Sequence, residues 1–128
     1  MKPNKILLAI LLLVILFGNR LGSTAPPFAT DSLKVLIVEE ANDRDNLPRE
    51  QVTALASQNW RTLVKTKGGE WRLLDPDADV TEAEPWIQEA MAVKRDSTPW
   101  LLIANGNRGT SEAFPANLDA LVELINGY

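Results

Sequence analysis

Residues 97–106 read Ser-Thr-Pro-Trp-Leu-Leu-Ile-Ala-Asn-Gly and carry the clearest structural signal in the chain. Their middle, residues 100–104, is a mostly apolar run with the length of one β-strand, which predicts a strand. Asn105-Gly106 follows directly, and this pair is a strong hairpin signal because both residues tolerate positive φ. We therefore expect the chain to turn back and form a more polar strand over residues 109–113.

The segments on either side of this hairpin predict two more strands and three helices. Residues 33–38 end in four consecutive apolar side chains, which is typical of a strand buried on both faces. Residues 70–74 predict another strand. Amphipathic helices are expected over residues 48–63, over residues 83–94, and after Asn117, which would cap the last of them.

The helix expected over residues 48–63 rests on one apolar stripe with helical spacing. The stripe consists of Val52, Leu55, Ala56, Trp60 and Leu63. Asn46 is the candidate cap of this helix, and Gly68-Gly69 is expected to stop it. In the alternative interpretation, residues 61–66 and 70–74 pair as a hairpin around the two glycines.

The order of these elements predicts the fold class. The first half is a βαβ unit, and such a connection joins two parallel strands. The second half is a β-hairpin followed by a helix. We therefore expect an α/β fold in which a mixed four-stranded sheet has helices on both faces.

The composition excludes several kinds of chemistry. The 128 residues include no Cys and no His, so the chain offers no thiolate, disulfide or imidazole to a substrate, metal or haem. Without residues 1–25, ten basic and seventeen acidic side chains remain, a net charge of −7. This charge argues against nucleic-acid binding and against a face that lies on anionic lipid. No cofactor is predicted.

The N-terminal residues predict export from the cytoplasm. Two lysines precede an unbroken apolar run over residues 6–18, as in a signal sequence. The run is short for a bilayer, which favours a cleavable signal peptide over residues 1–25, whereas Pro26-Pro27 beside the cleavage region favours an uncleaved membrane anchor. Residues 26–32 are expected to be a linker. Residues 33–128 are the expected domain, either periplasmic or secreted, or tethered to the membrane.

Residues 34–126 resemble the thioredoxin-like superfamily. The best match is Thr98-Pro99, followed by the apolar strand and by Asn105-Gly106, and the final helix lies at a matching distance. In that family the Thr-Pro peptide bond is cis and faces the redox site, so the resemblance implies a cis bond here. It also implies a surface beside this proline that receives extended peptides by strand-like backbone pairing.

The Cys-x-x-Cys motif of that family is absent. Counted from Val35 without gaps, Arg44 and Leu47 stand where the two cysteines would fall. Thiol–disulfide exchange is therefore impossible, and we expect a redox-inactive domain that binds a protein or an extended peptide in the cell envelope. The expected contact residues are Asp43, Arg44, Asp45, Asn46, Leu47, Thr98, Pro99 and Trp100.

Other interpretations of the polar segments stay open. The loop before Pro48 also fits a solvated turn whose carboxylates cap the following helix. Asp75, Asp77 and Asp79 alternate like calcium ligands, without the glycine and the closing glutamate of a calcium loop, and predict an acidic, calcium-responsive envelope protein. A carboxylate-based enzyme of unknown substrate would need one desolvated carboxylate among Glu39, Glu40, Asp43 and Asp45.

The chain contains four tryptophans, which is many for its length. Helical and strand spacing places most of Trp60, Trp71, Trp86 and Trp100 on core faces. Trp100 follows Pro99 directly, and we expect this indole to line an exposed groove that contacts a partner.

Overall fold

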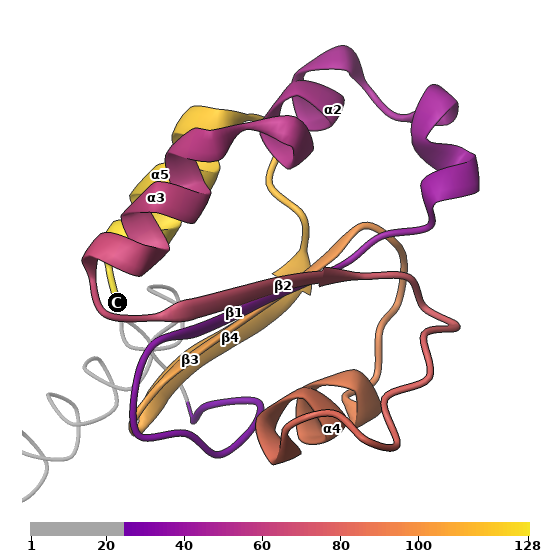
Figure 1. Ribbon diagram of the computed structural model, residues 1–128. Helices are drawn as coiled ribbons and strands as arrows, with labels where there is room; N and C mark the ends of the chain where they lie inside the picture. Colours follow the sequence, from indigo (N-terminus) through magenta and orange to yellow (C-terminus); the bar gives the residue numbers. More distant parts are fainter. Residues whose placement is uncertain (1–24) are drawn as a thin grey trace, which may run out of the picture.

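A computed structural model describes residues 25–128 of the chain (Figure 1). The predicted leader, except for its last residue, lies outside the described residues. Four strands form one sheet: β1 (Lys34–Val38), β2 (Glu70–Leu74), β3 (Trp100–Asn105) and β4 (Arg108–Ala113). Their order is β2-β1-β3-β4, and the prediction of an α/β fold with a mixed four-stranded sheet is confirmed.

The pairing of the strands also follows the prediction. β1 lies in the middle of the sheet, parallel to β2 and antiparallel to β3, and β4 pairs antiparallel with β3. The central position explains why residues 35–38 are fully buried, since a middle strand is covered on both faces. Val38, the last residue of β1, pairs with Leu74 on one side and with Trp100 on the other.

Helices cover both faces of the sheet, as expected. On one face lie α2 (Arg49–Ala56), α3 (Gln58–Thr66) and α5 (Leu118–Asn126), and α4 (Pro85–Ala92) lies on the other (Figure 1). The Asn117 side chain accepts a hydrogen bond from the Ala120 amide at 2.9 Å, which confirms the predicted cap of the last helix. Gly68, with φ +78, follows the end of α3 as predicted.

The single helix predicted over residues 48–63 is wrong, because the chain breaks at Ser57. This residue is extended, with ψ 140, and its hydroxyl caps the next helix by accepting from the Asn59 amide. The break frees carbonyls at the end of α2, and two side chains of α3 satisfy them: the Trp60 indole donates to Ala54 and the Arg61 guanidinium to Leu55.

The break also changes the details of that prediction. Ala56 is exposed rather than part of the apolar stripe. The N-cap position of α2 is occupied by Pro48, and no side chain caps the start of this helix. The expected cap at Asn46 is therefore wrong. Residues 61–66 are helical, which excludes the alternative hairpin with β2.

The hairpin between β3 and β4 is confirmed with a shift of one residue in its loop. Asn105 is the last residue of β3 and pairs with Arg108, so the two loop residues are Gly106 and Asn107. Gly106 alone has positive φ, at +62, which fits a two-residue turn with Gly in its first position. The Thr98–Pro99 bond that precedes β3 is cis, as the resemblance implies.

The sheet separates two hydrophobic cores because successive side chains of a strand point to opposite faces. Val35 and Ile37 pack against the α2, α3 and α5 side, where Trp60 is fully buried. Leu36 and Val38 pack against the α4 side. This second core contains Phe28, Trp86, Ile87, Ala90, Trp100 and Leu102.

Residues 26–32, predicted to be a linker, pack against the domain at their centre. Phe28 is 4% exposed and stacks on Trp86, with 5.7 Å between ring centroids. The Ala29 amide donates to Glu89 on α4. Pro26 and Pro27 lie against Gly109 of β4, where an added Cβ would meet Pro27 Cδ at 2.7 Å. The segment therefore covers part of the α4 side of the sheet.

Across residues 25–128, none of the helices has both the length and the apolar character that crossing a membrane requires. The predicted signal peptide or anchor lies almost entirely before this range, so it stays a prediction.

Candidate functional site

Two of the predicted contact segments meet at one end of the sheet. The pairing of Val38 with Trp100 places the chain that leaves β1 beside the chain that enters β3. The first continues into the short 3-10 helix η1 (Ala41–Asn46), and the second comes from Thr98-Pro99. Tertiary pairing thus brings together residues that are more than fifty positions apart in the sequence (Figure 1).

Local hydrogen bonds build η1 from a polar sequence. The Glu40 side chain accepts from the Asn42 amide at 3.4 Å, and the Asp43 amide donates to the Glu40 carbonyl at 3.0 Å. At the end of the turn, the Leu47 amide donates a hydrogen bond to the Arg44 carbonyl at 3.1 Å. The Leu47 side chain packs against the core and anchors the end of the turn, so it is not a freely exposed contact residue.

A buried carboxylate holds η1 to the sheet. Glu39 is 2% exposed, and the Arg44 guanidinium binds both of its oxygens: Nε donates to Oε2 at 3.1 Å, and Nη2 contacts Oε1. This hydrogen-bonded carboxylate raises the pKa of Arg44 above its ordinary value. The Glu39 amide donates to the Leu74 carbonyl at 2.9 Å, which fixes the carboxylate at the end of β1.

The pairing of Glu39 with Arg44 was not predicted from the sequence. An acidic residue directly after a buried strand, five positions before an arginine, is the only signal, and it is a weak one. The pair bears on the enzyme alternative, because Glu39 is the desolvated carboxylate that this alternative requires. Both of its oxygens accept hydrogen bonds from the guanidinium, however, and the residue is 2% exposed, so the geometry gives this carboxylate a structural role in holding η1.

The turn before β3 presents free backbone groups. Pro99 is buried, and its carbonyl accepts from the Phe114 amide at 3.0 Å. Thr98 is half-buried. Among residues 25–128, the Thr98 amide and carbonyl have no hydrogen-bond partner. Groups of this kind are open to pairing with an extended chain.

The expectation that Trp100 lines an exposed groove is wrong. Its side chain lies in the α4-side core, the residue is 9% exposed, and its indole N–H donates to the Ser111 hydroxyl at 2.9 Å. The reason is the alternation along β3, which directs Trp100, Leu102 and Ala104 to the same buried face. Of the predicted contact residues, Asp43, Asp45 and Asn46 are exposed, and Arg44 and Thr98 are partly exposed.

We call these five residues the η1 surface: Asp43, Arg44, Asp45, Asn46 and Thr98. The Arg44 charge is balanced by Glu39, so the two aspartates leave this surface with an acidic balance. The side chain of Arg44 is nevertheless 43% exposed, and Nη1 makes no hydrogen bond within residues 25–128. An arginine held in this way presents a fixed donor to a carbonyl or carboxylate group.

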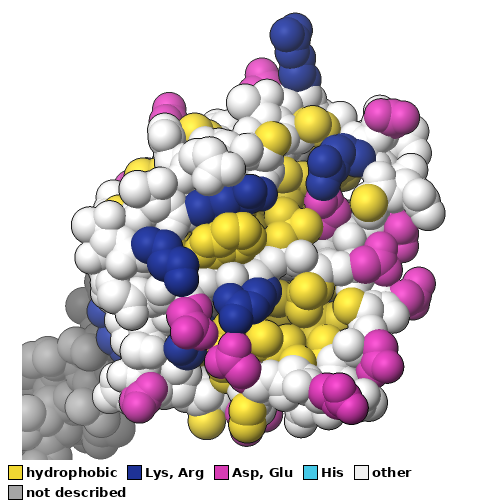
Figure 2. Space-filling view, viewed as in Figure 1, with side chains coloured by type: hydrophobic (Ala, Val, Ile, Leu, Met, Phe, Trp, Pro, Cys, Tyr) yellow, Lys and Arg dark blue, Asp and Glu magenta, His cyan; other side chains and the backbone are white. Residues whose placement is uncertain are grey.

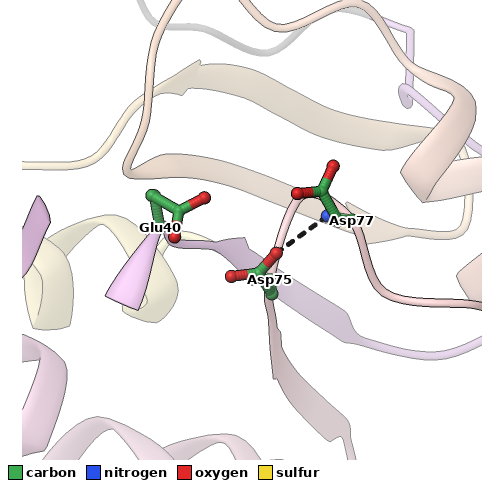
Figure 3. A group of neighbouring side chains, drawn as sticks. All are labelled: Glu40, Asp75 and Asp77. Carbon is green, nitrogen blue, oxygen red and sulfur yellow. Dashed lines mark hydrogen bonds between the residues drawn. The ribbon is translucent and has the colours of Figure 1, made fainter. Parts of the chain in front are cut away.

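Three carboxylates converge next to this end of the sheet (Figure 3). Glu40, which follows β1, lies near Asp75 and Asp77, which follow β2, with one oxygen of each within 4.8 Å of the others. Asp75 also accepts from the Asp77 amide at 2.9 Å. The three side chains come from two separate loops, which is why the sequence pattern did not connect Glu40 to the aspartates.

Asp79, predicted as a third calcium ligand, is not in this cluster. Its carboxylate accepts from the amide and the hydroxyl of Thr81, and these hydrogen bonds lower the pKa of Asp79. Calcium in proteins takes six to eight oxygen ligands, and three surface carboxylates do not by themselves supply them. The calcium alternative therefore stays a prediction, and of its three expected ligands only Asp75 and Asp77 lie together.

Two hollows on the surface lie away from the η1 surface. One, of about 420 Å³, lies between the starts of α2 and α5 and includes Arg49, Thr53 and Asn117. The other, of about 510 Å³, lies between β4 and α5 and includes Arg108, Glu112 and Tyr128. Desolvation raises the pKa of the Tyr128 phenol in the second hollow. Neither hollow contains a predicted contact residue.

Comparisons with family models, with curated proteins and with solved structures found no match to this chain. The resemblance to the thioredoxin-like superfamily therefore stays a prediction from the sequence.

Proposed function

We propose that this chain is an exported or membrane-tethered thioredoxin-like domain without redox activity, which binds an extended segment of another envelope protein at the η1 surface. The absence of cysteine removes thiol chemistry, and the remaining groups at this surface are donors, acceptors and charges. Hydrogen-bond donors, acceptors and charges are sufficient for binding another protein.

The arrangement of the elements supports the thioredoxin-like part of the proposal. The resemblance implies a βαβ unit followed by a hairpin and a helix. The strand order β2-β1-β3-β4, with only the β1–β2 pair parallel, has this form. The split of the first helix into α2 and α3 keeps both halves on the same face of the sheet, so the connection between β1 and β2 remains a single crossover.

One observation carries the binding part of the proposal: the Val38–Trp100 register brings η1 and Thr98 to the same end of the sheet. Thr98 offers an amide and a carbonyl without partners among the described residues, which suits backbone pairing with an extended chain. Arg44, held by the buried Glu39, offers Nη1 to a carbonyl or carboxylate of the same segment.

Site-specific photocrosslinking of the full-length chain tests this proposal. A photoreactive phenylalanine derivative is placed at Asn46 or, as the control, at Asn107, which is exposed in the hairpin loop at the other end of β3. In cells that encode the protein, we expect a covalent adduct with one envelope protein from position 46 and none from position 107.

A charge variant shows whether the adduct depends on the η1 surface. Asp45→Arg should reduce the yield from position 46 at least fivefold, because it reverses an exposed charge beside Arg44 without changing the core. Asp119→Arg, the same change at an exposed position of α5, should leave the yield unchanged. Equal adducts from positions 46 and 107, or no adduct from either, would contradict the proposal.

A further inference from the structure

The outer edge of β2 is open in the part of the chain that the structure describes. β2 pairs with β1 alone, so one side of its backbone has no strand beside it. All five residues of β2 are partly exposed, whereas β3 is almost fully buried. An open edge with apolar side chains is a template for the addition of another strand.

Two backbone hydrogen bonds fix which backbone groups of β2 point outward. The Glu70 amide donates to Leu33 at 3.0 Å, and the Leu74 carbonyl accepts from Glu39 at 2.9 Å, so both residues face β1. In a parallel pair the backbone direction alternates along the strand. The amides and carbonyls of Trp71 and Leu73 therefore point away from the sheet, and the Arg72 guanidinium reaches the Trp71 carbonyl from outside at 2.8 Å.

The side chains beside this edge are apolar and basic. Trp71 is half-buried against Trp60, and the Arg61 guanidinium lies over its ring at 4.6 Å. Lys65 follows one helical turn after Arg61, on the same side of α3. Figure 2 shows this side of the molecule, where Lys and Arg side chains gather around hydrophobic patches, with Asp and Glu side chains along the right and lower rim and also directly beside the basic ones.

The segment from α3 to β2 has a charge opposite to that of the whole domain, although Arg72 is paired with Glu84, and Asp75 and Asp77 follow β2 directly. Residues 58–74 contain four basic side chains and one acidic side chain, a net charge of +3, whereas the chain after residue 25 carries −7. We propose that the free edge of β2 is a docking site for an extended acidic segment of another protein, which adds to the sheet as a fifth strand beside Trp71 and Leu73.

Charge favours an acidic segment over two other possible occupants of the β2 edge. A second copy of the chain, paired edge to edge, would bring two regions of +3 together, which costs free energy. The N-terminal residues 1–24 contain three basic side chains and no acidic one, so the same repulsion applies to them. An acidic strand meets attraction from Arg61, Lys65 and Arg72 within the screening distance of about 10 Å at 0.1 M salt.

Arg72 is compatible with this docking. Its guanidinium also binds Glu84 at 2.9 Å, so it stays at the edge when a strand arrives. The Trp71 carbonyl has a second lone pair, which can accept from the amide of the added strand while Arg72 keeps the first.

Fluorescence polarisation with labelled peptides tests the proposal on the full-length chain in mild detergent. The probes are the hexapeptide Glu-Val-Glu-Val-Glu-Val and its counterpart Lys-Val-Lys-Val-Lys-Val. We expect the acidic peptide to bind at least tenfold more tightly than the basic one. Its NMR shift changes should be largest at the Trp71 and Leu73 amides and small at Ser111, which lies on the other edge strand, β4.

Charge variants separate the edge from a general effect of net charge. Lys65→Glu should weaken binding of the acidic peptide at least fivefold, and Lys94→Glu, the same change outside α3 and β2, should change it less than twofold. The proposal is overturned if neither peptide binds at millimolar concentration, if both bind equally, or if the two variants behave alike. A dimer in sedimentation that the acidic peptide does not dissociate would also overturn it.

Discussion

The two faces of the sheet are closed in different ways. On one face α2, α3 and α5 form a continuous helical layer over Val35 and Ile37. On the other face the described residues 25–128 place one helix, α4, and the extended segment around Phe28 and the loop before α4, with Val80 and Ala83, complete the cover. Lys34 and Arg72 lie beside this core, with Lys34 Nζ 5.7 Å and Arg72 Cζ 5.9 Å from the centroid of the Trp86 ring.

This difference has a consequence for the stability of the domain. The helical face is held by elements with their own backbone hydrogen bonds, whereas the segment 25–33 depends on side-chain packing against α4 and β4. The apolar area that Phe28 buries is therefore needed to keep the second core closed. Substitutions on the α4 side test whether this segment is part of the domain or an attached tail.

The largest effect is expected for Phe28→Ala. Removing a buried aromatic ring should lower the free energy of unfolding by about 3 kcal/mol, measured by urea denaturation. Phe28→Leu keeps most of the volume and should cost about 1 kcal/mol. If the alanine variant lowers the free energy of unfolding by less than about 0.5 kcal/mol, the level of a surface substitution, residues 26–32 behave as a linker that does not stabilise the domain.

A smaller effect is expected for Gly109→Ala, which tests the contact of the same segment with β4. The added Cβ would lie 2.4 Å from the Ile103 carbonyl oxygen and 2.7 Å from Pro27 Cδ, so we expect a loss of about 2 kcal/mol. Gly127→Ala is the matched control, because its Cβ would stay 3.3 Å from the Leu124 carbonyl. Equal melting temperatures for the two variants would show that neither Ile103 nor Pro27 packs closely on Gly109.

The smallest effect concerns Glu70, which lies on the α4 face and pairs with Lys34 at 3.2 Å. The Lys34 ammonium beside it lowers the pKa of Glu70 below its ordinary 4.5. A carboxyl group with a lowered pKa in the folded state stabilises the fold above its unfolded pKa, and this contribution disappears as the pH falls through the folded pKa. The pair is partly exposed, so solvent screens it.

Glu70→Gln should therefore lower the free energy of unfolding by about 0.5 kcal/mol at pH 7 and by nothing well below pH 4.5, measured from urea midpoints. Glu123→Gln, an exposed position on α5, should show no such dependence on pH. A difference between wild type and Glu70→Gln that persists at low pH would assign the effect to packing rather than to charge.

Much of the fold could be predicted from local patterns. The apolar run before Glu39, the Asn105-Gly106 pair and the Asn117 cap each depend on neighbouring residues, and each is confirmed apart from the one-residue shift of the hairpin loop. The helix break at Ser57 was not predicted, because an apolar stripe with helical spacing runs across it. The capping of the Ala54 and Leu55 carbonyls by Trp60 and Arg61, six positions further along the chain, makes the break stable, and the apolar pattern does not indicate these side-chain hydrogen bonds.

The candidate site was predicted less completely than the fold. Counting along the sequence located the turn around Arg44 but did not reveal that Glu39 is its buried partner. The position of Trp100 next to a proline suggested exposure, whereas its place in the alternation of β3 buries it. The acidic cluster combines Glu40 with Asp75 and Asp77, which only the parallel pairing of β1 and β2 brings together.

The amino-acid sequence alone determined that this protein has no thiol or imidazole chemistry, and that its strands and helices alternate in one order, because composition and local hydrogen bonding need no distant partner. Only the tertiary structure decided which face each side chain occupies around the sheet, that Phe28 belongs to the core, and that β2 is an edge strand among the four strands of residues 25–128. The reason is that burial is a property of what packs against a residue, and those neighbours come from parts of the chain that the local sequence does not name.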